Sequence, residues 1–182
     1  QQGLDCSTST ASGSVAYERA IKAVSNADEF DINLLSTPGL IYNLHPSPIN
    51  LAQQTVQDRG DAFYVFDAVA WGDGINSAVN AITSVDTNYA ATYYPWVKLL
   101  DDTVNLPIWV PPSVVIPGVI AQNDRVAHEW FAPAGLNRGG LRGVLEAKTR
   151  LTHAERDLLY ENRINPIASF PGQGVVVFGQ KT

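Results

Sequence analysis

A segment rich in glycine and arginine, FAPAGLNRGGLRG at residues 131–143, has the residue types of a phosphate-binding loop. Glycine backbone lets several N–H groups converge on an anion, and Arg138 and Arg142 would add positive charge. The spacing fits neither GxGxxG nor GxxxxGK[S/T], because the glycine pair is followed by Leu-Arg. We therefore expect a turn whose glycines take positive φ, with a nucleotide-binding domain that uses the Gly135–Gly143 loop as the alternative.

Aspartates near the ends of expected strands are the second candidate for chemistry: Asp31, Asp67, Asp101 and Asp102. Carboxylates at the carboxyl edge of an α/β sheet can hold magnesium or act as general acid and base. Asp31, however, precedes its strand, and no nucleophile adjoins any of the four. Helix caps and turns are the ordinary positions of such aspartates, and we favour those roles.

Histidine, cysteine and serine add no clear active site. His45, His128 and His153 are far apart in sequence, and neither CxxC nor HExxH occurs. A Ser-His-Asp arrangement stays open, but no GxSxG elbow supports it. The lone Cys6 cannot form an intrachain disulfide, which fits folding in a reducing compartment. The sequence thus predicts no enzyme, no catalytic residue, no metal and no cofactor.

Aromatic residues gather in the segment YYPW at residues 93–96. Because aromatic side chains bury large areas in cores and interfaces, we interpret them as anchors at the end of a strand. The two arginines of the glycine-rich segment are expected to pair with acidic groups inside the fold or on a neighbour. The candidate structural or interface residues are Tyr93, Tyr94, Trp96, Asn137, Arg138, Arg142, Asn165 and Pro166.

Composition limits the partners. A net charge of −6 argues against nucleic acid, since phosphate backbones are bound by clustered Lys and Arg. No apolar run reaches the roughly 20 residues that a membrane-spanning helix requires. Only 16% of the residues are charged, which leaves neutral surface of the kind that packs against other subunits.

The elements that must position these residues alternate along the first half of the chain. Helical patterns cover residues 15–27, 48–58, 75–85 and, behind a Thr152–Glu155 capping box, 153–163. Strand patterns cover residues 32–35, 62–71, 89–101 and 172–179. Ser47 is expected to cap the second helix and Gly60 to end it, while Pro38–Gly39 should end the first strand.

This alternation predicts an α/β fold with a mixed, largely parallel sheet flanked by helices and an irregular second half rich in Pro and Gly. Four prolines within residues 106–124 favour an edge or loop-rich segment there. Residues 1–14 are expected to be a flexible lead-in and residues 15–182 a single α/β domain. The absence of methionine and the blunt ends suggest an internal piece of a longer protein.

Several segments occur along the chain in the following order: NADEFDINLLSTPG, TNYAATYYPWVKLLDD, PPSVVIPGVIAQND, WFAPAGLNRGGLRGV and LLYENRINPIASFPGQGVVVFGQKT. In this combination the chain resembles the tail sheath proteins of contractile-tailed bacteriophages. The resemblance covers about residues 27–182, and YYPW, APAGLNRG and the closing INPI, FPGQG and FGQKT segments are its most specific parts.

The resemblance implies a structural subunit of a helical sleeve that contracts around a tail tube and drives it through the host envelope. It implies as partners neighbouring sheath subunits, the tube protein, and baseplate and terminator proteins, in a virion assembled in the host cytoplasm. It also implies that the family's C-terminal domain and linking arms are missing here, so that this piece alone is monomeric. A sheath-like subunit of a secretion system or bacteriocin is the alternative that the sequence leaves open.

Overall fold

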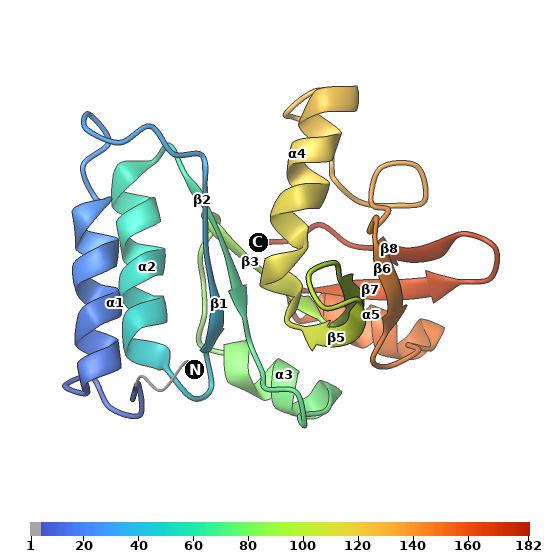
Figure 1. Ribbon diagram of the computed structural model, residues 1–182, viewed down its shortest axis with the longest axis horizontal. Coiled ribbons are helices and arrows are strands. Elements are labelled where there is room, and N and C mark those ends of the chain that lie inside the picture. Colours follow the sequence, from blue (N-terminus) through green and yellow to red (C-terminus); the bar gives the residue numbers. More distant parts are fainter. Residues whose placement is uncertain (1–4) are drawn as a thin grey trace.

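The computed structural model describes residues 5–182, and within them a five-stranded sheet organises the fold (Figure 1). Its strand order is β1-β2-β3-β7-β8, with β1 to β3 and β7 parallel and β8 antiparallel to β7. The strands are β1 (Leu34–Ile41), β2 (Phe63–Asp67), β3 (Ala90–Tyr94), β7 (Ile164–Phe170) and β8 (Gly174–Val177). The predicted mixed, largely parallel sheet is therefore confirmed.

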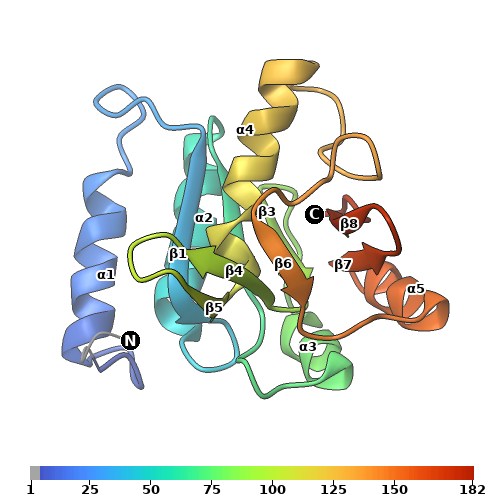
Figure 2. The ribbon, with the colours of Figure 1, turned by 45° about the vertical axis from the view of Figure 1, so that its right-hand side comes forward.

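A second, smaller sheet has the order β5-β4-β6 and is entirely antiparallel (Figure 2). Its strands are β4 (Val97–Asp101), β5 (Leu106–Val110) and β6 (Val144–Ala147). The helical elements are α1 (Ser12–Ala23), α2 (Pro46–Arg59), α3 (Ile75–Ile82), the 3₁₀ turn η1 (Pro112–Val114), α4 (Ile116–Val126) and α5 (His153–Glu161).

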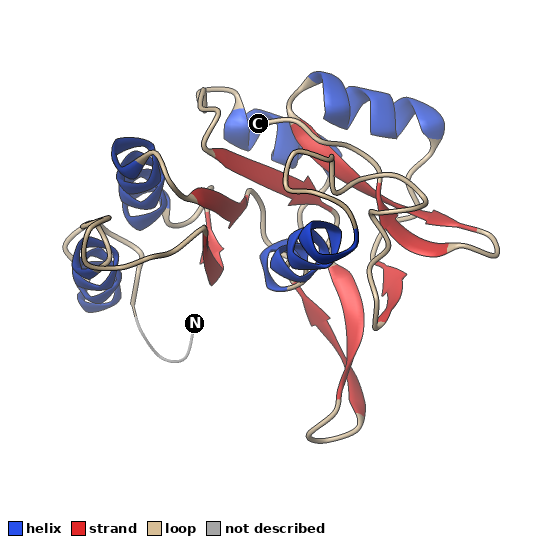
Figure 3. Cartoon of the chain, turned by 90° about the horizontal axis from the view of Figure 1, so that it is seen from above, coloured by secondary structure: helices blue, strands red, loops and turns tan. Residues whose placement is uncertain are grey.

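Both faces of the main sheet are covered, and each face has its own core. Helices α1 and α2 lie on one side and α4 on the other, as the view from above also shows (Figures 1 and 3). Strand β2 alternates accordingly, because Tyr64 and Phe66 belong to the core under α1 and α2 while Val65 belongs to the core under α4. Burial on both faces explains why the central strands read as nearly continuous apolar runs.

Two sequence predictions, one about β1 and one about α2, need correction. Strand β1 does not end at Pro38–Gly39 but continues to Ile41, with a register shift after Ser36. Proline is tolerated there because β1 is an edge strand. Helix α2 begins at Pro46 with His45 at the N-cap position, not with Ser47. Its end is as predicted, since Gly60 adopts a left-handed φ of 74°.

The expected strand over residues 89–101 is two strands in two different sheets. β3 pairs with β2 and β7, whereas β4 pairs with β5 and β6. The chain changes sheets at Pro95 and Trp96, where proline provides no N–H for a ladder. Because the apolar run is continuous through this point, the sequence pattern alone does not show that the strand is divided between two sheets.

The proline-rich segment contains more regular structure than expected. Pro107 lies in the edge strand β5, as predicted, but Pro112 and Pro117 occupy first-turn positions of η1 and α4. Backbone N–H groups in the first turn of a helix have no acceptor within the helix, so the N–H that proline lacks is not missed there. Proline at those positions is therefore compatible with the start of a helix. Helix α4 and strand β7 were not predicted, while the capping box of α5 at Thr152 and Glu155 is confirmed.

Part of the expected lead-in belongs to the folded body. Residues 1–4 lie outside the described residues, but α1 starts at Ser12, earlier than predicted, and Cys6 is buried in the core. A Cβ on Gly13 would lie 2.5 Å from the carbonyl oxygen of Asp5, so glycine is needed for this close approach.

Candidate functional site

The glycine-arginine segment runs alongside β8 as an additional antiparallel edge. The N–H of Gly135 donates to the carbonyl of Val177 at 2.8 Å, and the N–H of Val177 donates to the carbonyl of Gly139 at 2.7 Å. Further along, the N–H of Leu141 donates to the carbonyl of Val175 at 2.9 Å. The segment thus covers the β8 edge of the main sheet, which would otherwise expose unpaired backbone groups.

Two of the glycines, Gly135 and Gly139, serve this pairing. Gly135 and Gly143 take positive φ angles of 84° and 79°, as expected for a turn. Gly139 is buried, and a Cβ there would lie 2.5 Å from the carbonyl oxygen of Val177. The N–H groups of Gly135 and Gly139 both donate to backbone carbonyls, and the segment leads into β6 rather than into a helix. Nothing in this geometry favours nucleotide binding.

The polar side chains of the segment face different surroundings. The guanidinium of Arg138 lies 4.6 Å from the centre of the Phe131 ring, a cation–π contact within the segment's own turn. Asn137 is exposed. Arg142 is also exposed, and it forms no ion pair or side-chain hydrogen bond with any of residues 5–182.

Asn165 fixes the last residues of the chain against the sheet. It is fully buried, and its amide donates to the carbonyls of Thr92 at 3.2 Å and Lys181 at 2.8 Å. Its oxygen accepts from the N–H of Lys181 at 2.6 Å. The neighbouring carbonyl of Pro166 accepts from the N–H of Phe178 at 2.8 Å, so both residues hold the segment that follows β8.

The aromatic segment YYPW divides its side chains between the two cores. Tyr94 packs on the side of α1 and α2, and Tyr93 packs on the side of α4, where burial raises the pKa of its hydroxyl to about 12. The indole N–H of Trp96 donates to the carbonyl of Val69 at 3.1 Å. Trp71, which lies 5.9 Å from Trp96 between ring centres, joins this cluster from the loop after β2.

The candidate carboxylates do not form an acid–base pair. Asp67, at the end of β2, is buried and accepts from the N–H of Ser113 at 3.1 Å and from its hydroxyl at 2.6 Å. Burial raises the pKa of this carboxyl to about 7, although the two bonds from Ser113 oppose the shift. Asp31 is exposed, and Asp101 accepts from the N–H of Thr103 in a turn.

The three histidines lie in separate environments. His45 is buried and its Nδ1 accepts from the N–H of Ile41 at 3.1 Å, and burial lowers its pKa. His153 lies 2.8 Å from the carboxylate of Asp157, and the ring of His128 stacks on an exposed tryptophan. Within residues 5–182, no group of three or more His, Cys, Asp or Glu is placed to hold a metal ion.

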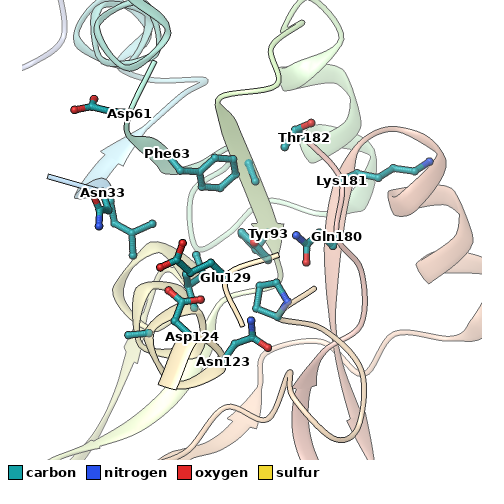
Figure 4. A pocket seen from close by; sticks show the side chains of 15 residues that line it. Asn33, Asp61, Phe63, Tyr93, Asn123, Asp124, Glu129, Gln180, Lys181 and Thr182 are labelled. Carbon is teal, nitrogen blue, oxygen red and sulfur yellow. The ribbon is translucent and has the colours of Figure 1, made fainter. Parts of the chain in front are cut away.

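A pocket of about 550 Å³ was not anticipated from the sequence (Figure 4). It lies between α4 and the amino ends of β1 and β2, with the last residues of the chain at its other side. Its lining combines the rings of Phe63 and Tyr93 with the side chains of Asn123, Asp124 and Glu129. These residues come from β2, β3, α4 and the following loop, so only the fold brings them together.

The class of protein follows from these observations: an α/β domain whose glycine-arginine segment completes the sheet. Residues 13–182 match the phage tail sheath protein central domain. The chain therefore belongs to the phage tail sheath protein family, whose members are structural proteins of contractile tails and not enzymes. None of the helices in the described part is long and apolar enough to cross a bilayer.

Relatives with known roles support this assignment. The chain is 38% identical over 134 residues to the tail sheath protein of Vibrio phage KVP40, a match that covers 71% of this chain and 20% of the relative. It is 32% identical over 118 residues to the tail sheath protein of Enterobacteria phage T4, a match that covers 65% of this chain and 18% of that relative. The chain thus spans about a fifth of the length of the curated relatives it matches.

Solved structures show the same fold in assembled sheaths. The helical sheath of the anti-feeding prophage in its contracted state gives a TM-score of 0.63 at 27% identity, covering 89% of this chain and 42% of that one. The contracted sheath complex of PVC, an extracellular contractile injection system, gives a TM-score of 0.65 at 30% identity. That match covers 89% of this chain and 43% of the PVC chain. The likeness therefore extends beyond phages to related injection systems.

Proposed function

We propose that the chain is part of a structural subunit of a contractile phage tail sheath. Such subunits polymerise around the tail tube and contract, driving the tube through the host cell envelope during genome delivery. The match of residues 13–182 to the sheath central domain carries this proposal. Contraction needs two packings of the same subunits that differ in free energy. The difference adds up over all the subunits of the sleeve, so no nucleotide is needed to drive the change.

The partners on this proposal are neighbouring sheath subunits, the tail tube protein, and baseplate and terminator proteins. The sleeve is assembled in the host cytoplasm and remains in the virion. No nucleic acid or membrane insertion is involved. The eight candidate residues then act in the fold or at subunit contacts, with Arg142 the member most available to a neighbour because it is exposed and unpaired within residues 5–182.

An epitope tag in the exposed turn between β7 and β8, at Gly172–Gln173, tests the proposal in the whole protein. We expect gold-labelled antibody along the entire sleeve of purified particles, and deletion of the gene should leave bare tubes. Particles that keep a contractile sleeve after deletion would contradict the proposal.

The likeness to the anti-feeding prophage and PVC sheaths favours one alternative, a sheath subunit of a contractile injection system. The same particles discriminate the two. A DNA-filled capsid on the labelled tail supports a phage, whereas labelled sleeves that never carry a capsid support an injection system.

A further inference from the structure

The pocket beside α4 carries negative charge without an internal counter-ion. Asp124 and Glu129 line it, are exposed, and form no ion pair with residues 5–182. Asp61 at the rim is already paired with Arg59 at 2.8 Å. Lys181 also lines the pocket, but its ammonium lies 4.1 Å above the Tyr160 ring and points away from the two carboxylates (Figure 4). A cation from outside is therefore electrostatically favoured here.

A buried acceptor at the same place lacks a hydrogen bond. Asn123 is 1% exposed and lines the pocket, and its amide nitrogen donates to the carbonyls of Phe131 at 2.8 Å and His128 at 3.4 Å. These two bonds fix the orientation of the amide. Its oxygen has no partner among the described residues. The oxygen itself is enclosed, with almost no surface open to solvent, so the acceptors that an incoming donor can reach are the carboxylates of Asp124 and Glu129.

The chemistry of the lining selects an arginine side chain. The two carboxylates offer four acceptor oxygens, to which the N–H donors of a planar guanidinium can bond in pairs. The rings of Phe63 and Tyr93 supply apolar and π surface of the kind that guanidinium groups stack on. A volume of about 550 Å³ leaves room for one long side chain with water.

Arg142 has the complementary properties and lies on the other side of α4. It lines a separate hollow formed by Gly118 and Gln122, whereas the acidic pocket is lined by Ile120 and Asp124. Positions two apart on a helix are turned by about 200° around its axis, so the two hollows face in opposite directions. One copy of the chain therefore presents the acceptor on one flank and the donor on the other.

We propose that the acidic pocket binds Arg142 of a second copy of this chain. An interface between two different patches is head-to-tail, and its repetition generates a ring or an open helix. The inference rests on the proposed sheath function and deepens it, because a helical sleeve requires a contact of this kind. It places the Asp124–Glu129 pocket of each subunit against the Arg142 hollow of its neighbour.

Charge exchange in the complete sheath protein tests the contact. We expect Arg142→Glu alone, or Asp124→Lys with Glu129→Lys, to lower the sedimentable sleeve fraction by roughly tenfold, because like charges then face each other across the interface. The three substitutions combined in one chain should restore assembly. Arg150→Glu and Glu161→Lys, which change exposed residues outside both hollows, are the matched controls and should assemble normally.

Circular dichroism of each variant separates lost contact from lost folding, and only folded variants are compared. Normal sleeves from both single-side variants would overturn the contact while leaving the sheath function standing. Disruption by the pocket variant but not by Arg142→Glu would overturn Arg142 as the occupant. Failure of the wild-type protein to form sleeves would count instead against the proposed function.

Discussion

Gly139 and its neighbour Gly140 differ in the space around them. A Cβ on Gly139 would lie 2.5 Å from the carbonyl of Val177 and 2.9 Å from the Cα of Ala134, whereas nothing lies within 4 Å of one on Gly140. Because the close atoms are backbone, Gly139→Ala must displace the segment from β8. We expect a loss of about 1–3 kcal/mol in the free energy of unfolding, measured by urea denaturation.

Gly140→Ala is the matched control and should change stability by no more than about 0.5 kcal/mol. Equal stability of the two variants would show that the segment does not need its close approach to Val177.

A second residue-scale prediction concerns Asp67. Its carboxyl has a pKa of about 7 in the folded protein, above its ordinary value of 3.8, mainly because it is buried. Between these values the unfolded chain binds fewer protons than the folded one, so the free energy of unfolding falls as pH rises from about 4 to 7. Asp67→Asn removes this contribution and retains partners for Ser113, because an amide both accepts and donates.

We therefore expect the stability of Asp67→Asn to depend less on pH than that of the wild type. Between pH 5 and pH 8 the melting temperature of the variant should rise relative to that of the wild type, as measured by thermal melts. Asp31→Asn, at an exposed carboxylate, should follow the wild-type profile. If Asp67→Asn also follows it, burial does not disfavour the charged carboxylate at this position.

At the scale of elements, the side chain of Asn165 fixes the segment after β8 at Lys181. Asn165 makes three hydrogen bonds, two of them to the backbone of Lys181. Asn165→Ala should release this segment from β7 and cost about 1–3 kcal/mol, since buried groups lose their partners. Hydrogen exchange should show lost protection at the Lys181 amide while Ile167, in the middle of β7, stays protected. Unchanged exchange at Lys181 would contradict this role.

The elements also show what the sequence can and cannot predict. The capping box at Thr152 and the left-handed Gly60 were predictable because each is set by neighbouring residues. The change of sheet at Pro95 and the strand β7 were not, because both depend on pairing with distant strands. The four prolines of residues 106–124 predicted an edge or loop-rich segment, although Pro117, in the first turn of a helix, is compatible with α4.

The candidate residues divide in the same way. Their chemical types suggested that Arg138 and Arg142 need partners, but only the fold shows that Arg138 lies on Phe131 while Arg142 is free within residues 5–182. The acidic pocket was missed because its residues are far apart in sequence. A local signal existed in Asp124 and Glu129, two acidic residues that flank the end of α4, yet it does not reveal the orphan oxygen of Asn123.

At the scale of the whole molecule, the two cores share the same strands. β2, β3 and β7 contribute to both, so neither core can open without disturbing the other. Leu159→Ala in the core under α1 and α2, and Ile116→Ala in the core under α4, each remove a side chain that is at most 1% exposed. Each should cost about 2–5 kcal/mol and lower a single melting transition, whether followed by far-UV or near-UV circular dichroism. Two separate transitions in either variant would show that the faces of the sheet unfold independently.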